Sequence, residues 1–259
     1  MTKKESNYTS VNGLNMYYEI HGEGKPLVLL HGALSEIKTS FGNLIPRLTE
    51  SRQLIAIEQQ AHGHTEDVDR ALTIDQMTKD TVALLKHMGI EKTDVFGYSM
   101  GASIALQMAI MHKDLVQKLI VASVTYNNKG FQPGLLEGME NLKPENLNGS
   151  PWQKEYLRIA PDPEDWPLLV YKVKEMNLNI PDWPVEKIQS IEAQSMIIIG
   201  DSDIVLPEHA VEMFKLMGGR NDEISNSQLL ILPGITHITV LDREDWILPM
   251  IEEFLSTTK

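Results

Sequence analysis

One serine in this chain lies between two glycines in a pattern typical of a nucleophile. The segment Gly97-Tyr98-Ser99-Met100-Gly101 follows the apolar residues Val95 and Phe96. A serine on a sharp strand-to-helix turn has a strained backbone, and glycines two residues before and after it leave room for the neighbouring chain. Such a turn presents the hydroxyl at a helix N-terminus, where the next N–H, that of Met100, points at any oxyanion that forms. We therefore predict that Ser99 is a nucleophile.

A serine hydroxyl needs a general base near neutral pH, and His237 is the best placed of the eight histidines. It lies in a loop between the apolar run Leu229–Leu232 and the last predicted helix. Loops that follow parallel strands converge on one edge of a sheet, which is also the edge that carries the serine turn. We predict that His237 accepts the proton of Ser99.

Two carboxylates compete for the position behind the imidazole. Asp201 and Asp203 both follow an apolar run that ends at Gly200. We choose Asp203, which lies further into the loop, because Asp201 has the alternative role of a turn aspartate bonded to local N–H groups. The chain order Ser99, Asp203, His237 is the order expected for a serine elbow of this kind.

These residues require a scaffold of buried strands, and the hydrophobic pattern predicts one. Continuous apolar runs, unlike alternating ones, indicate strands covered on both faces, and they occupy 26–30, 54–57, 95–98, 119–122, 196–199 and 229–232. The alternating stretch 14–20 predicts an edge strand or a hairpin. Helical patterns cover 74–88, 100–111, 207–217 and 245–255. This alternation predicts an α/β fold: a mostly parallel, doubly wound sheet of about eight strands.

One long stretch interrupts this alternation. Residues 125–189 contain 8 of the 13 prolines and three of the four tryptophans. Proline interrupts long helices, so the pattern predicts short helices and turns. We interpret 125–189 as a helical cap inserted into a core made of 1–124 and 190–259. The alternative is a separate small domain, but helices this short would not readily form their own core.

Composition excludes several classes of function. The chain has 259 residues, a formal charge of −13 and no cysteine, so disulfides, thiolate metal sites and a cysteine nucleophile are excluded. An acidic surface does not favour nucleic acid or anionic membranes. The N-terminus lacks the pattern of a secretory signal, and no apolar run is long enough to span a bilayer. We expect a cytoplasmic protein with a small-molecule substrate, no nucleic-acid or membrane partner and no cofactor; the oligomeric state is not predicted.

Three motifs resemble the α/β-hydrolase superfamily, in particular its esterase-like members with a helical cap, over nearly the whole chain. They are Leu29–Ala33, the serine elbow, and Gly200-x-x-Asp203 with the His237 loop. The resemblance implies that the N–H of Ala33 joins that of Met100 in an oxyanion hole. Its spacing also favours Asp203 over Asp201, and the serine at the elbow separates this chain from relatives with aspartate there, which open epoxides or remove halide.

The segment 58–65 departs from the pattern of the family. Members often have Asp-x-Arg-Gly-His-Gly-x-Ser there, whereas this chain has Glu-Gln-Gln-Ala-His-Gly-His-Thr. The absent arginine changes any polar network in this loop. His62 and His64 suggest a metal pair with Glu58 or Asp67, but a structural role is favoured, because a metal site needs three or four ligands placed together.

The leading hypothesis is hydrolysis of a small carboxylic ester through an acyl-enzyme. The same triad also suits a lactonase, an amidase, a perhydrolase or a carbon–carbon bond hydrolase, and a slow-turnover small-molecule receptor is the alternative of another class. We expect the cap to line the substrate pocket, with one or two of its tryptophans facing the substrate: Trp152, Trp166 and Trp183.

Overall fold

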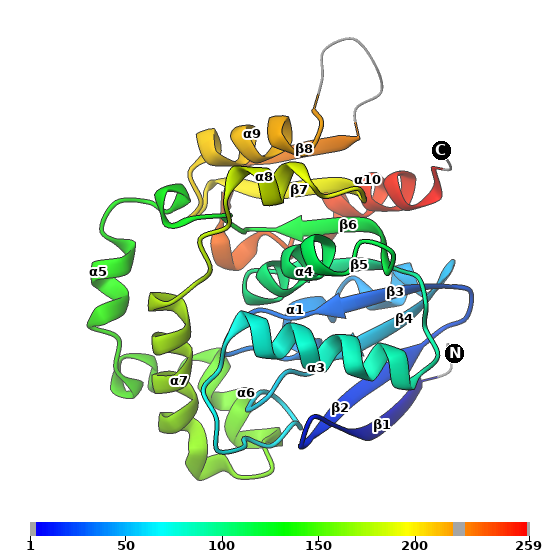
Figure 1. Cartoon of the computed structure of the whole chain (residues 1–259). Helices are drawn as coiled ribbons and strands as arrows, with labels where there is room; N and C mark the ends of the chain where they lie inside the picture. The colour runs from blue at the N-terminus through cyan, green and yellow to red at the C-terminus, as the bar shows by residue number, and fades with distance from the viewer. Residues whose placement is uncertain (1–3, 220–225, 258–259) are drawn as a thin grey trace.

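The computed structural model describes residues 4–219 and 226–257, which form an eight-stranded sheet with helices on both faces (Figure 1). The strand order is β1-β2-β4-β3-β5-β6-β7-β8. Strands β3 to β8 are mutually parallel, whereas β2 is antiparallel to both β1 and β4. The strands are β1 (Lys4–Val11), β2 (Leu14–His21), β3 (Lys25–Leu30), β4 (Arg52–Ile57), β5 (Thr93–Tyr98), β6 (Val116–Ala122), β7 (Gln194–Ser202) and β8 (Ser227–Thr236). The predicted doubly wound, mostly parallel sheet is confirmed.

Each face of the sheet buries its own apolar cluster. Helices α3 (Ile74–His87), α4 (Met100–Met111) and α9 (Pro207–Leu216) cover one face, and α1 (Ile37–Phe41), α2 (Ile45–Leu48) and α10 (Glu244–Ser256) cover the other. The central strands are fully buried, because both of their faces lie against helices. Their uninterrupted apolar sequences are explained by this position.

The first two strands form the hairpin that the alternating stretch predicted as one possibility. Asn12 and Gly13 both have positive φ, 49° and 80°, which suits a two-residue turn that matches the twist of its strands. One edge of the sheet is therefore β1, which the apolar pattern did not predict because most of its residues are exposed. The other edge is β8, and the expectation that its run 229–232 is covered on both faces is corrected, because within that run only Leu232 is buried.

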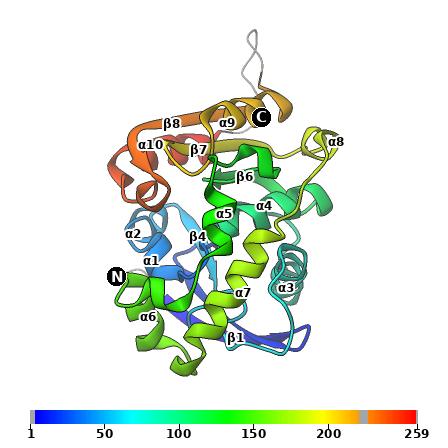
Figure 2. The same ribbon diagram turned by 90° about the vertical axis from the view of Figure 1, so that its left-hand side faces the viewer.

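Between β6 and β7 the chain forms six short helices and one helix of 13 residues, α7 (Trp166–Leu178), so the expectation of short helices alone is corrected there. Its proline, Pro167, lies in the first turn, where proline does not interrupt a helix. The short helices are η1 (Asn128–Gly130), α5 (Leu135–Glu140), η2 (Pro144–Leu147), α6 (Pro151–Ile159), η3 (Pro163–Asp165) and α8 (Val185–Gln189). In Figure 1, α5, α6 and α7 lie at the ends of the strands that the arrowheads mark, and Figure 2 views the molecule from that side. They stand over the carboxyl edge of the parallel sheet. Within 4–219 and 226–257, no helix is both long and apolar enough to cross a membrane.

Candidate active site

Ser99 occupies a strained turn between β5 and α4. Its φ is 53° and its ψ is −116°, a conformation that costs free energy for a residue with a side chain. The two flanking glycines explain how the turn fits. A Cβ at Gly97 would lie 2.2 Å from the carbonyl oxygen of Gly101, and a Cβ at Gly101 would lie 2.0 Å from that of Leu30. Any side chain at either position would force the backbone apart.

The structure brings together the three residues of the predicted triad. The Nε2 atom of His237 lies 3.0 Å from Ser99 Oγ, and its Nδ1 atom lies 2.9 Å from Asp203 Oδ1. These residues follow β5, β7 and β8 and are 34 to 138 positions apart in the chain. With Nδ1 protonated toward the carboxylate, Nε2 is free to accept the proton of the serine hydroxyl.

Asp203 is buried and its carboxylate is held by several donors. Its Oδ2 accepts hydrogen bonds from the Ser123 hydroxyl and the Gly200 N–H. Burial alone would raise the pKa of Asp203, but the hydrogen bond and charge of His237, with those two donors, outweigh burial and hold the pKa below its ordinary value. The carboxylate is therefore ionised and fixed in orientation.

Asp201, the rejected candidate, has the local role described for a turn aspartate. Its side chain is exposed, and Oδ1 accepts hydrogen bonds from the Gly234 N–H at 2.9 Å and the Ser202 hydroxyl at 3.0 Å. These bonds lower its pKa, the bond from Gly234 contributing most. Asp201 joins the end of β7 to the loop that carries His237 and does not contact the imidazole.

Two residues that the sequence did not single out hold the triad in position. The Tyr98 hydroxyl donates a hydrogen bond to the carbonyl oxygen of His237 at 2.8 Å, and the two rings lie 5.5 Å apart. Ser123, at a φ of 57°, donates its N–H to the carbonyl of Ile198 and its hydroxyl to Asp203. Tyr98 belongs to the elbow motif, so its proximity was predictable; nothing in the sequence marks Ser123.

The segment after β3 brings the predicted oxyanion residues to the same cavity as the nucleophile. Gly32, Ala33, Ser99 and Met100 all line it. His31 is fully buried, with Nδ1 2.8 Å from the Gly32 carbonyl oxygen and Nε2 accepting the Gln59 N–H at 3.1 Å. Burial, with a smaller contribution from His62, lowers the pKa of His31 to about 3. His31 is a neutral imidazole that fixes the backbone before Ala33.

This cavity has a volume of about 340 Å³, which is within the range of small-molecule sites. Ser99 and His237 lie on its core side, and residues of α5, α6 and α7 form the opposite wall. Trp152 lines it. Trp166 and Trp183 do not belong to its lining. Trp166 is buried against Tyr156, and the Trp183 indole donates to Gln107 Oε1, so both serve packing.

The histidines of the 58–65 loop make protein contacts. His62 Nδ1 lies 2.8 Å from the Gln60 carbonyl oxygen, and His64 Nδ1 lies 3.0 Å from Glu58 Oε2. The hydrogen bond to Glu58 raises the pKa of His64, whereas burial lowers that of His62 to about 4. Among residues 4–219 and 226–257, no group of three or more metal-binding side chains gathers at one point.

Comparison with known proteins identifies a family. The family model described as alpha/beta hydrolase fold matches residues 25–170. Serine hydrolase BPHL of Mus musculus is 24% identical over 262 residues, which cover 95% of this chain and 84% of that protein. Soluble epoxide hydrolase of Corynebacterium sp. (strain C12) is 32% identical over 132 residues, which cover 51% of this chain but only 43% of that protein. The chain thus spans less than half the length of this relative.

A solved structure extends the likeness to the whole fold. The 2-hydroxy-6-oxo-6-phenylhexa-2,4-dienoate hydrolase of Rhodococcus sp. strain RHA1 superposes with a TM-score of 0.78 over 99% of this chain and 100% of that one. The two sequences are 19% identical, so the likeness concerns the fold.

Proposed function

The chain belongs to the α/β-hydrolase family, and from that premise we propose that it is a serine hydrolase that cleaves carboxylic esters through an acyl-enzyme intermediate. One observation carries the proposal. The Ser99 hydroxyl, the His237 imidazole and the Asp203 carboxylate form a continuous hydrogen-bonded chain at the wall of an apolar cavity. This is the arrangement that activates a serine for acyl transfer.

In the first half of the reaction, Ser99 Oγ attacks the ester carbonyl while His237 Nε2 takes its proton. The charge that develops on the carbonyl oxygen is stabilised by the backbone N–H groups of Ala33 and Met100. Met100 is the first residue of α4, so its N–H has no partner within the helix and remains free for the oxyanion. His237 then gives the proton to the leaving alkoxide, and Ser99 carries the acyl group.

In the second half, water takes the place of the alcohol. His237 removes a proton from the water as it attacks the acyl carbonyl, and returns that proton to Ser99 when the acid leaves. Asp203 stabilises the imidazolium in both halves without taking its proton. We further propose that residues 125–189 act as the cap of this site, since α5, α6 and α7 supply one wall of the cavity.

Replacement of the nucleophile tests this proposal. We expect Ser99→Ala to lower kcat for a short-chain 4-nitrophenyl ester by roughly four to six orders of magnitude, because no other group takes over the attack. A fluorophosphonate probe should label native protein at Ser99 and leave the variant unlabelled. Ser190→Ala, which changes a half-buried serine outside the cavity, is the control. An unchanged rate in Ser99→Ala would overturn the assignment.

A broader panel separates the other reactions of the same triad. Lactones, amides, peracid formation and carbon–carbon bond cleavage differ in the leaving group, which the triad does not select. Turnover of esters at least tenfold faster than of these substrates is expected. Tight binding with negligible turnover of every compound would instead indicate a receptor.

A further inference from the structure

The cavity beside Ser99 has no charged side chain in its lining. Of its 26 lining residues, all within the described chain, none is Lys, Arg, Asp or Glu. The wall opposite the nucleophile is mainly aliphatic and thioether, with these residues from α5, α7 and the link after α5: Leu135, Leu136, Met139, Leu142, Val173 and Met176. A charged group that entered would lose its hydration and find no counter-ion there.

The polar groups of the lining are neutral, and several already have partners. Ser35 Oγ lies 2.6 Å from Thr39 Oγ1 and 2.8 Å from Ser40 Oγ. The Ser123 hydroxyl is bonded to Asp203. On α7, the Asn177 amide lies 3.9 Å from the sulfur of Met139. These groups do not replace the water shell of an ion.

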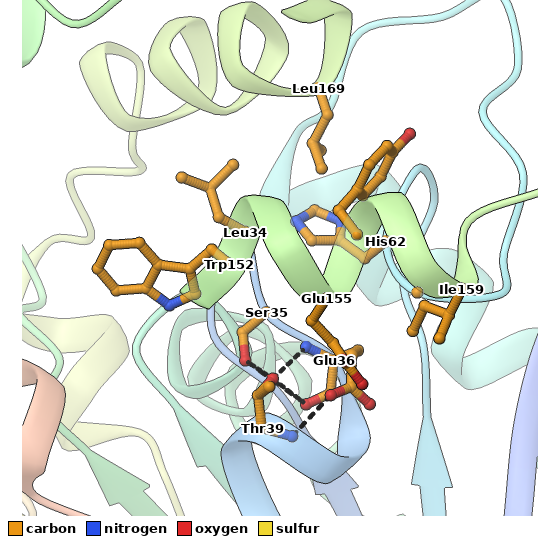
Figure 3. A pocket seen from close by; sticks show the side chains of 11 residues that line it. Leu34, Ser35, Glu36, Thr39, His62, Trp152, Glu155, Ile159 and Leu169 are labelled. Carbon is orange, nitrogen blue, oxygen red and sulfur yellow. Dashed lines mark hydrogen bonds between the residues drawn. The ribbon is translucent and has the colours of Figure 1, made fainter. Parts of the chain in front are cut away.

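Two carboxylates, Glu36 and Glu155, lie behind the wall of the cavity. A second pocket of about 10 Å³ shares Leu34, Ser35, Thr39 and Trp152 with the cavity, and Figure 3 shows Glu36 and Glu155 in it. Glu36 accepts the N–H groups of Lys38 and Thr39 at 2.6 and 2.7 Å. The hydrogen bond from Arg158 lowers the pKa of Glu155. Glu155 is compensated by Arg158, so the carboxylate of Glu36, with the net charge of −13, opposes an anion in the neighbouring cavity.

Three cations on the helices of this wall are engaged elsewhere, and one of them, Lys174 of α7, donates to the carbonyl of Glu140. Lys172 of α7 donates to Asp67 Oδ2 at 2.6 Å and to the carbonyls of Val68 and Arg70. Arg158 of α6 is exposed and bound to Glu155 through two nitrogen atoms. None of these three side chains lines the cavity. No cation therefore faces a ligand carboxylate.

We propose that the substrates are esters whose acyl group is uncharged and predominantly aliphatic, and that the cavity rejects acyl groups ending in a carboxylate or an ammonium. This inference rests on the proposed ester hydrolysis. The acyl part is assigned to the cavity because it stays attached to Ser99, which lines the cavity, while the alcohol must leave. The carboxylate released by hydrolysis forms at Ser99, where the oxyanion donors are, and not at the aliphatic wall.

Four 4-nitrophenyl esters of similar length test the proposal on the native protein. They are the heptanoate, the neutral 6-oxoheptanoate, the anionic hydrogen adipate and the cationic 6-aminohexanoate. The ketone matches the carboxylate in size, and four or five methylene groups keep each end group away from the scissile carbonyl. We expect kcat/KM for both charged esters to be lower than for the heptanoate by on the order of a hundredfold or more, with the ketone within about tenfold of it.

The outcomes distinguish this inference from the proposed function. Hydrolysis of all four esters within tenfold of one another would leave the esterase standing and overturn the neutral-acyl assignment. Hydrolysis of none would overturn the esterase, and the inference with it. In a straight-chain series from acetate to hexanoate, each methylene should raise kcat/KM by up to about fourfold, and a flat series would also contradict an aliphatic acyl site.

A charge placed in the wall separates electrostatic from steric exclusion. Asn177→Lys puts an ammonium group on α7 beside the cavity, and Asn177→Gln is the matched neutral variant. We expect the ratio of adipate to heptanoate kcat/KM to rise at least tenfold in Asn177→Lys and to stay within about threefold of native in Asn177→Gln. A ratio that rises in neither, or equally in both, would show that charge is not the basis of the exclusion.

Discussion

The two ends of the parallel sheet both contain buried ionisable groups, but they use them differently. At the carboxyl end, Asp203 and His237 end in the Ser99 hydroxyl, which lines a cavity. At the amino end, Arg52 of β4 is paired with Asp94 of β5, and Lys25 of β3 also reaches Asp94, at 3.2 Å. The first chain of contacts ends at a cavity, whereas in the second the buried pair of Arg52 and Asp94 is surrounded by protein atoms and only Lys25 is partly exposed.

The amino-end cluster holds the last helix. Arg52 donates to the carbonyl of Leu255, and Lys118 of β6 donates to those of Phe254 at 2.6 Å and Leu255 at 3.1 Å. Two cations thus satisfy carbonyl groups at the C-terminus of α10, where the helix dipole is negative. Charged groups whose hydrogen bonds are all made within the protein stabilise the fold. A series of hydrogen bonds that ends at a hydroxyl beside a cavity can also act on a bound molecule. The comparison predicts that mutations at the two ends will affect different properties.

The largest change in activity is expected from a mutation at the carboxyl end of the sheet. Asp203→Asn should lower kcat by about 10⁴-fold, because an amide neither fixes the required tautomer of His237 nor stabilises its imidazolium. The measurement is steady-state hydrolysis of a neutral 4-nitrophenyl ester, together with thermal unfolding. Asp201→Asn, a carboxylate two residues away that does not contact His237, is the control and should stay within about tenfold of native. Equal losses in the two variants would contradict the choice of Asp203.

A mutation at the amino end of the sheet is expected to lower stability and leave activity unchanged. Asp94→Asn leaves the buried guanidinium of Arg52 without its counter-charge and should lower the free energy of unfolding by about 3 kcal/mol, while kcat per folded molecule stays unchanged. Urea unfolding measures the first and hydrolysis the second. In Asp75→Asn, which breaks an exposed pair with Lys79, the stability change should be below about 0.5 kcal/mol. Loss of activity in folded Asp94→Asn would contradict the prediction that the amino-end cluster affects stability alone.

Two buried histidines near the carboxyl end of the sheet should lower the free energy of unfolding of the protein in acid. The pKa values of His31 and His62 are about 3 and about 4, against an ordinary value of 6.5. Between pH 6.5 and pH 4 the unfolded chain binds protons at these positions and the folded chain does not, so stability falls as the pH falls. Each histidine contributes up to about 1.4 kcal/mol per pH unit.

Urea unfolding at several pH values within this window tests the assignment. His62→Gln should remove one of the two contributions and flatten the dependence of the unfolding free energy on pH. A variant whose slope equals that of the native protein would show that His62 does not titrate differently on folding.

The smallest effect concerns the tyrosine that spans the elbow and the histidine loop. Tyr98→Phe removes the hydrogen bond to the His237 carbonyl and should lower kcat by about two- to tenfold, with little change in KM, because the imidazole is held less firmly. Tyr171→Phe, on the exposed face of α7, is the matched control and should have native kinetics. A rise in KM at constant kcat would instead make Tyr98 a substrate-binding residue.

The elements that could be predicted from the sequence are those whose pattern of apolar residues follows directly from their burial. The apolar runs at 95–98 and 196–199 correspond to central strands because those strands are covered on both faces. Strand β1 was not predicted, since it is an exposed edge and its polar residues carry little information. The short helices α1 and α2 were not predicted either, because five and four residues are too few for a helical period to be apparent.

The candidate site likewise contains residues that could be predicted from the local sequence and residues that could not. Ser99 and Asp203 follow the buried strands β5 and β7, and His237 follows the edge strand β8. Their proximity was predictable because parallel strands bring the residues that follow them to one edge of the sheet. The roles of Ser123 and the tryptophans depend on tertiary packing, which one sequence does not encode locally. Trp183, for example, is directed to Gln107 by a contact across 76 positions. The limits of cap and core at 125–189 stay a prediction.

The backbone of Ser99 also limits how this position can change in evolution. A φ of 53° is poorly tolerated by β-branched residues, so threonine, the other hydroxyl-bearing aliphatic side chain, is excluded even though its chemistry would suffice. Unbranched side chains such as cysteine and aspartate remain compatible with the turn. A substitution of Ser99 that keeps this turn therefore changes the attacking group, to a thiol or a carboxylate. Exchange of the serine hydroxyl for that of threonine does not keep it.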